Sequence, residues 1–178
     1  MAQQKKVLVT GGSGRIGNVV VSTLLDRGHA VVNFDCRKQR GGRATFVYGN
    51  VRNRSEVAAA MRGCDAVFHL AELAGPALPV PIDEIFWGNT CAGSVVMQSA
   101  MDLGIGRLIY TSSCQVYGCW EENSVPPVRL PFDESHPLQP RNVYALSKAA
   151  NEGFARYVHD RSGIPISIFR LPLVIFDF

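Results

Sequence analysis

Short runs of apolar and β-branched residues alternate along the chain with longer segments whose apolar positions recur every three to four residues. The short runs are almost continuously hydrophobic, which is typical of strands buried on both faces of a parallel sheet. They predict strands at residues 5–10, 30–34, 45–48, 66–70, 107–111 and 166–171. The longer segments predict helices at residues 15–27, 54–61, 83–103 and 142–161.

A glycine follows each expected helix, at the position where a left-handed residue commonly ends a helix. These glycines are Gly28, Gly63, Gly104 and Gly163. The regular alternation of strand and helix predicts right-handed crossovers and an α/β fold. We expect residues 1–178 to form a single domain, a doubly wound parallel sheet of the Rossmann type. The expected strand order is 3-2-1-4-5-6, with helices on both faces.

Two proline-rich segments, 74–81 and 118–140, interrupt this alternation directly after expected strands. The second is long for a loop in a compact domain, and such loops are usually functional. Since ligands bind at the carboxyl ends of the strands in open α/β folds, both segments are expected at the ligand-binding edge.

Composition excludes several classes of protein. The net charge is only +3, and the basic residues are scattered apart from the run 37–43, which argues against a nucleic-acid partner. No apolar run approaches the roughly 18 residues of a membrane span. The N-terminus leaves no room for a signal-peptide core, so a cytoplasmic location is expected.

The five cysteines are expected to be free thiols in a reducing compartment. They are odd in number and form no C-x-x-C pair; they are Cys36, Cys64, Cys91, Cys114 and Cys119.

His69 ends an expected buried strand without a partner at ligand spacing, so we expect a structural histidine. No metal site is predicted.

The glycine-rich stretch between the first strand and first helix carries the first candidate chemistry. Residues 12–17 read Gly-Ser-Gly-Arg-Ile-Gly, which satisfies G-x-G-x-x-G, and Gly11, Gly14 and Gly17 also give G-x-x-G-x-x-G. Glycines let the backbone approach a pyrophosphate closely, and a helix N-terminus offers unpaired N–H groups to an anion. The alternative is a tight strand-to-helix turn without a ligand.

Asp35 follows the second expected strand, near the spacing of about 20 residues at which an acidic residue binds the adenosine ribose. A carboxylate there favours NAD and repels the additional phosphate of NADP. Arg37 and Lys38 follow immediately and could bind that phosphate, so NADP remains an alternative. Asp35 could also be a solvated carboxylate at a strand end.

A tyrosine and a lysine at Tyr144 and Lys148 are spaced i, i+4, on one face of an expected helix. A phenol ionises near pH 10, too high for a base at neutral pH. A neighbouring ammonium and the positive nicotinamide would favour the phenolate, so we expect a lowered pKa for Tyr144. Tyr144 could then remove a proton from a substrate hydroxyl, and Ser113, at the end of the fifth strand, could hydrogen-bond the same oxygen. The alternative is a surface pair.

Four motifs occur together in order: TGGSGRIG at residues 10–17, HLA at 69–71, SSCQVYG at 112–118 and YALSK at 144–148. This set resembles the extended short-chain dehydrogenase/reductases, and among them the NAD-dependent epimerase/dehydratase family typified by UDP-glucose 4-epimerase. The resemblance covers nearly the whole chain.

The resemblance implies a role for each matching position. The pyrophosphate site would comprise Gly11, Gly14, Arg15, Ile16 and Gly17, and Asp35 would bind the adenosine ribose. Asn50 and Val51 would meet the adenine, Leu70 and Ala71 would run beside the cofactor, and Asn89 would support the backbone there. Ser113, Tyr144 and Lys148 match the catalytic triad, with Lys148 also binding the nicotinamide ribose. Two positions depart: Asn50 stands where Asp is more usual, and Glu72 replaces a usual small residue.

The implied activity is that of an NAD-dependent nucleotide-sugar epimerase or dehydratase. Thr111-Ser112-Ser113 does not supply the Thr-Asp-Glu signature of dehydratases, which favours an epimerase. The alternatives are an NAD(P)-dependent reductase of another alcohol or ketone, and a dinucleotide-binding module without turnover. Family members usually continue into a C-terminal substrate portion, which we expect to be largely absent here. They often pair through the two long helices, so a homodimer is expected.

Overall fold

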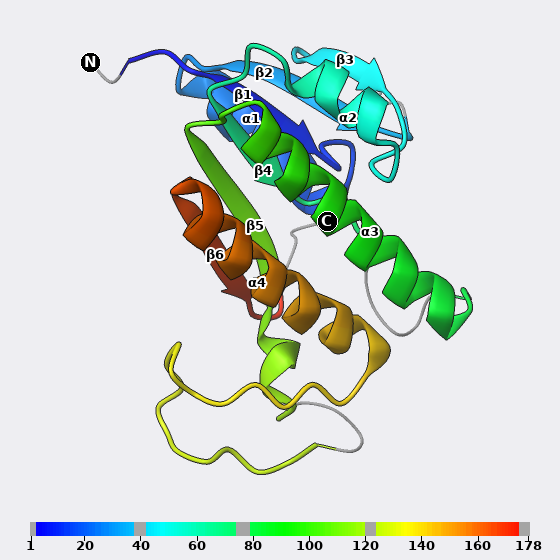
Figure 1. Cartoon of the computed structure of the whole chain (residues 1–178), viewed down its shortest axis with the longest axis vertical. Helices are drawn as coiled ribbons and strands as arrows, with labels where there is room; N and C mark the ends of the chain where they lie inside the picture. The colour runs from blue at the N-terminus through cyan, green and yellow to red at the C-terminus, as the bar shows by residue number, and fades with distance from the viewer. Residues whose placement is uncertain (1–2, 38–41, 74–78, 120–123, 175–178) are drawn as a thin grey trace.

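The computed structural model describes residues 3–37, 42–73, 79–119 and 124–174, and these contain a six-stranded sheet (Figure 1). The order is β3-β2-β1-β4-β5-β6, which confirms the predicted 3-2-1-4-5-6 arrangement. The strands are β1 (Lys6–Thr10), β2 (Ala30–Asp35), β3 (Thr45–Tyr48), β4 (Ala66–His69), β5 (Arg107–Ser113) and β6 (Ile166–Leu171). Every neighbouring pair is parallel, so the carboxyl ends of all six strands lie at one edge.

Helices cover both faces of the sheet, as expected (Figure 1). On one face lie α2 (Arg54–Met61), α3 (Ile82–Asp102) and α4 (Val143–Ser162). They enclose the larger hydrophobic core, which includes Leu8, Phe34, Val57, Val67, Met97, Leu108 and Val158. On the other face α1 (Arg15–Asp26) packs Val21 against Val7, Val9 and Val31. Each fully buried aliphatic side chain of this kind stabilises the fold by roughly 1.5–3 kcal/mol.

The start of α4 is fixed by a side-chain cap. Asn142 precedes the helix in an extended conformation, and its side-chain oxygen accepts a hydrogen bond from the Ala145 amide at 2.7 Å. Such a cap typically contributes about 1 kcal/mol. It places Tyr144 in the first turn and Lys148 in the second, on the same side of the helix. The predicted positive φ angles follow four helices, at Gly28, Gly63, Gly104 and Gly163.

The carboxyl edge of the sheet is more elaborate than the sequence predicted. β5 continues two residues past the expected end, to Ser113, and is followed by a short 3₁₀ helix, η1 (Cys114–Tyr117), which was not predicted. The described part of the second proline-rich segment then leads back to α4, and the Gln139 amide donates to the Val116 carbonyl of η1 at 2.8 Å. Lys38 and parts of both proline-rich segments (74–78 and 120–123) lie outside the described residues.

One end of the sheet is less well covered. Ile166 and Ile168 of β6 pack against the larger core. Because successive strand residues point to opposite faces, Phe169 points to the other face of the sheet, which α1 covers farther along. Phe169 is 51% exposed.

None of the described helices combines the length and the apolar composition needed to cross a lipid bilayer.

Candidate functional site

The loop between β1 and α1 is folded so tightly that only glycine fits at two positions. Gly11 has a φ of 73°, and a Cβ placed on it would lie 2.7 Å from the Ala71 amide nitrogen. Gly17 is buried in the first turns of α1, where a Cβ would overlap the carbonyl oxygen of Gly11. The glycines therefore bring the loop against both the β4 end and its own helix.

The N-terminus of α1 has the features of an anion site. Gly14 is the N-cap residue, and no side chain of the described residues caps the helix. The first turn contains no acidic residue, so no side chain of α1 itself offsets the positive end of the helix dipole. Arg15, exposed in this turn, adds a positive charge. The expected pyrophosphate residues Gly11, Gly14, Arg15, Ile16 and Gly17 thus lie in one loop and helix start that suit a phosphate.

Asp35, at the end of β2, is 6% exposed and lies beside this loop. Its Oδ2 accepts a hydrogen bond from the Ser13 amide at 3.0 Å, and its Oδ1 accepts one from the Arg37 amide at 2.8 Å. The carboxylate therefore also holds the glycine loop in place. Each of its oxygens has a second lone pair that could accept a ribose hydroxyl.

The expected adenine contacts lie next to Asp35, after β3. The Gly49 amide donates to the Asp35 carbonyl at 3.2 Å, which places Asn50 beside the β2 end. Asn50 is exposed, and its own amide is bound by Glu56 at 2.7 Å. Val51 instead packs partly against the larger core.

The end of β4 is tied to β1 through Thr10 and His69. Thr10 Oγ1 lies 2.7 Å from His69 Nδ1, and it also accepts the amides of Leu70 and Ala71 at 3.3 and 3.4 Å. Burial lowers the pKa of His69 to about 3, and the charge of Lys148 acts in the same direction. His69 is therefore neutral at pH 7, and its Nδ1 contact with Thr10 fixes the β4 end. Its buried Nε2 has no hydrogen-bond partner among the described residues, so the expected structural histidine is only half satisfied.

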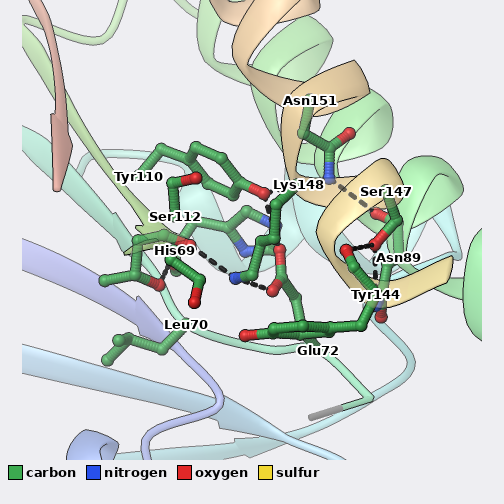
Figure 2. A network of polar contacts seen from close by, with 12 residues as sticks. His69, Leu70, Glu72, Asn89, Tyr110, Ser112, Tyr144, Ser147, Lys148 and Asn151 are labelled. Atoms are coloured by element: carbon green, nitrogen blue, oxygen red, sulfur yellow. Dashed lines mark hydrogen bonds and ion pairs between the residues drawn. The ribbon is translucent and has the colours of Figure 1, made fainter. Parts of the chain in front are cut away.

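Lys148 is the centre of a buried polar network at the β4 and β5 ends (Figure 2). Its Nζ donates to the Thr111 carbonyl at 2.6 Å and forms an ion pair with Glu72 Oε2. Both side chains are 4% exposed. Burial lowers the pKa of Lys148 to about 7, and the negative charge of Glu152 opposes this shift.

Tyr144 lies below this ion pair, with the Lys148 ammonium 5.3 Å from its ring centroid (Figure 2). Burial raises the pKa of Tyr144 to about 12, and Cys114 acts in the same direction. The expected lowering is therefore absent in the chain by itself. The physical reason is that the phenol is desolvated while the neighbouring ammonium is engaged by Glu72 and by the Thr111 carbonyl.

Adjacent serines at the end of β5 have separate environments. Ser112 is buried and donates to Glu152 Oε1 at 2.6 Å, which ties it to the interior of the sheet–helix interface. Successive strand residues point to opposite faces, and Ser113 is only partly buried. Its hydroxyl accepts the Gln115 amide at 3.2 Å, and within the described part of the chain its own O–H has no acceptor and could bind a ligand. This difference supports Ser113 over Ser112 as the candidate site residue.

Asn89 of α3 joins the loop after β4 to α4. Its side chain accepts the Leu73 amide at 2.8 Å and donates to the Leu73 carbonyl at 3.2 Å. It also donates to Ser147 Oγ at 3.2 Å, and Ser147 donates to the Tyr144 carbonyl at 2.7 Å. Asn89 thus links the loop after β4 to the start of α4.

Sequence reasoning missed the residues that surround the ion pair. Tyr110 donates to Glu72 Oε1 at 2.9 Å, and Asn151 donates to the Tyr110 hydroxyl at 3.3 Å. Asn151 follows Lys148 by three helical positions, so its place on the same face could have been found. In the sequence Glu72 stands out only because it replaces a usual small residue, and no local pattern indicates its pairing with Lys148.

Comparison with known proteins agrees with this geometry. A model of the NAD-dependent epimerase/dehydratase family matches residues 7–175. A UDP-glucose 4-epimerase from Streptomyces lividans is 32% identical over 154 residues, covering 82% of this chain and 45% of the relative. A uronate dehydrogenase from Pseudomonas syringae is 27% identical over 169 residues, covering 93% of this chain and 58% of the relative.

Solved structures give the same result. The crystal structure of a short-chain dehydrogenase/reductase superfamily protein from Agrobacterium tumefaciens, with bound NAD, superposes with a TM-score of 0.81. The two sequences are 32% identical, and the match covers 93% of this chain and 48% of that one. The chain thus spans about half the length of these relatives.

Proposed function

Because the chain belongs to the NAD-dependent epimerase/dehydratase family, we propose that it binds NAD and takes part in the epimerisation of a nucleotide sugar. The observation that carries the proposal is the joint placement of two features at one sheet edge. The uncapped glycine loop at the start of α1 suits a pyrophosphate. At the neighbouring ends of β4 and β5, Tyr144 lies beside the buried Lys148.

Each part of the dinucleotide has a candidate partner in this arrangement. The pyrophosphate would lie on the glycine loop and the first turn of α1, with the adenosine ribose on Asp35. The adenine would meet Asn50 and Val51, and the chain at Leu70 and Ala71 would run beside the cofactor. The nicotinamide ribose would bind Lys148. The buried Asp35 carboxylate supports a preference for NAD over NADP.

Bound NAD supplies the acceptor and donor of hydride in this chemistry. Tyr144 would remove the proton of the sugar hydroxyl and return it after the ketone has rotated, and Ser113 would donate a hydrogen bond to the same oxygen. Since the pKa of Tyr144 is raised by burial to about 12, its role as a base depends on a positive charge nearby. The charge of oxidised nicotinamide is the candidate, because the ammonium of Lys148 is already paired with Glu72.

We propose that residues 1–178 form the dinucleotide-binding domain and that most of the sugar-recognising surface comes from elsewhere. The chain's span of about half the length of its relatives supports this division. The exposure of Phe169 at the end of the sheet supports it too, because an apolar strand position of this kind is usually covered.

The test of the proposed function is a panel of UDP-, GDP- and dTDP-sugars incubated with the chain and NAD, with products separated by chromatography. Interconversion of two sugars that differ at one hydroxyl is the expected result. Net NADH formation without an epimer would instead indicate a dehydrogenase, the activity named for the Pseudomonas syringae relative. Tight NAD binding without any product would indicate a binding module.

We also propose that the chain forms a homodimer through α3 and α4. Large side chains are exposed along the two helices, with Trp87 69%, Tyr157 57% and Leu146 49% exposed. Between the helices lies a groove of about 350 Å³, lined by Trp87, Thr90, Cys91, Ser94, Ala150, Asn151 and Phe154. Such an apolar patch on one face supports burial against a second copy.

Ala150→Arg should convert this dimer to a monomer, because it places a charge at the centre of the proposed interface. Light scattering coupled to gel filtration should show the molar mass falling by half. Val19→Arg, which adds the same side chain at an exposed position of α1 on the opposite face of the sheet, should leave the mass unchanged. A monomeric wild-type chain would contradict the proposal.

We further propose a cytoplasmic location. All five cysteines are free thiols, including the exposed Cys36. Free exposed thiols persist in reducing compartments, whereas oxidising ones favour their pairing.

A further inference from the structure

The ion pair between Glu72 and Lys148 joins two side chains that are almost completely buried. Glu72 comes from the loop after β4, and Lys148 comes from the second turn of α4. Glu72 is held from both sides, since its Oε1 accepts the Tyr110 hydroxyl at 2.9 Å and its Oε2 pairs with the ammonium. Figure 2 shows the carboxylate between Tyr110 and Tyr144, pointing at Lys148.

The other titratable groups around this pair are neutral or paired with another residue. From β5, Tyr110 faces Glu72 with a pKa that burial raises above its ordinary value, and from α4 Tyr144 is protonated at neutral pH. His69 on β4 is neutral. Glu152 is itself paired with Arg170 at 2.8 Å, and Cys114 of η1 faces Tyr144. Glu152 also acts on the ammonium through its charge, but among the residues the structure describes Glu72 is the carboxylate in direct contact with Lys148.

The chemistry of the cofactor makes this cancellation consequential. With the pyrophosphate at α1 and the adenosine at Asp35, the nicotinamide end belongs at the Tyr144–Lys148 side. Oxidised and reduced dinucleotide share every part except the ring, which is positively charged only when oxidised. A difference in affinity between the two forms thus reports on the charge of the protein at this end.

We propose that Glu72 is a specificity-determining residue for the redox state of the dinucleotide, and that by cancelling the charge of Lys148 it favours the oxidised form. The inference rests on the dinucleotide site of the proposed function and not on the sugar reaction. The resemblance implies a small residue at position 72. The proposed selectivity therefore comes from a residue that is particular to this chain.

The test compares the dissociation constants of NAD and NADH for wild type, Glu72→Gln and Glu72→Asp, measured by calorimetry at pH 6. Gln keeps an oxygen for the Tyr110 hydroxyl but removes the charge, so the fold is retained. In the wild type the ammonium is charged at pH 6, because burial lowers the pKa of Lys148 only to about 7. Since loss of the Glu72 carboxylate lowers this pKa further, the Glu72→Gln titrations are repeated at lower pH. Asp102→Asn is the control. It also removes one negative charge, but at the C-terminus of α3, where Asp102 pairs with Arg54 on the surface.

In Glu72→Gln the ratio of the NADH to the NAD dissociation constant should fall by about tenfold, equivalent to about 1.4 kcal/mol. Glu72→Asp and Asp102→Asn should keep the wild-type ratio. A ratio that stays constant in Glu72→Gln while both constants change together would overturn the proposal and leave Glu72 a packing residue. Failure of the sugar panel would refute the proposed turnover but would not alter this ratio, so the two outcomes are distinguishable.

Discussion

Tyr144→Phe is expected to lower kcat for nucleotide-sugar conversion by about 10²–10⁴-fold, the usual contribution of a positioned acid or base. The change removes one hydroxyl and keeps the ring that lies against the Lys148 ammonium. The fold and the affinity for NAD should therefore be retained within about twofold, since none of the contacts of the glycine loop is altered. Initial rates at saturating sugar, together with calorimetric NAD titration, measure both quantities.

Tyr157→Phe is the matched control for this variant. It makes the same chemical change in the same helix, at a side chain that is 57% exposed. Its kcat should equal that of the wild type. If Tyr144→Phe turned over sugar as fast as Tyr157→Phe, the proton-transfer role of Tyr144 would be refuted.

Glu152→Ala should have the largest effect on stability, lowering the free energy of unfolding by about 3–5 kcal/mol. Glu152 is fully buried, and its two oxygens accept Arg170 Nε at 3.0 Å and Nη2 at 2.8 Å. Truncation leaves the Arg170 guanidinium, whose side chain is 13% exposed, without its carboxylate. It also removes the acceptor of the Ser112 hydroxyl. Urea unfolding followed by circular dichroism gives the free energy.

Arg156→Ala provides the control, because Arg156 pairs with the same Glu152 oxygen at 3.1 Å but its side chain is 55% exposed. Exposed pairs contribute about 0–1 kcal/mol, so this variant should remain close to wild type. The double variant Glu152→Leu/Arg170→Met removes both buried charges and should recover part of the loss. Equal losses in Glu152→Ala and Arg156→Ala would contradict the account of this network.

The fold could be predicted from the sequence because its signals are local and repeated. The strands of an all-parallel sheet are continuous apolar runs, as in β1 and β2, and α2 was predicted at the observed bounds, Arg54–Met61. Glycines mark the helix ends, such as Gly163 after α4. Crossover handedness then leaves few possible strand orders.

The candidate site was only partly predictable, because its groups meet through long-range packing. The spacing of Tyr144 and Lys148 is local to one helix, so their shared face could be inferred. The ion pair with Glu72 joins the loop after β4 to α4, and only the folded chain brings those residues together. The lowered pKa expected for Tyr144 is absent in the chain by itself for the same reason, since burial and the engagement of Lys148 were not visible in the sequence.

The central claim is that the loop at residues 11–17 and Asp35 form an NAD site, and calorimetric titration of the chain with NAD and NADP tests it most directly. The account predicts saturable binding of one NAD per chain, at least about tenfold tighter than NADP because Asp35 repels the additional phosphate. Absence of heat with either dinucleotide would contradict it, as would tighter binding of NADP.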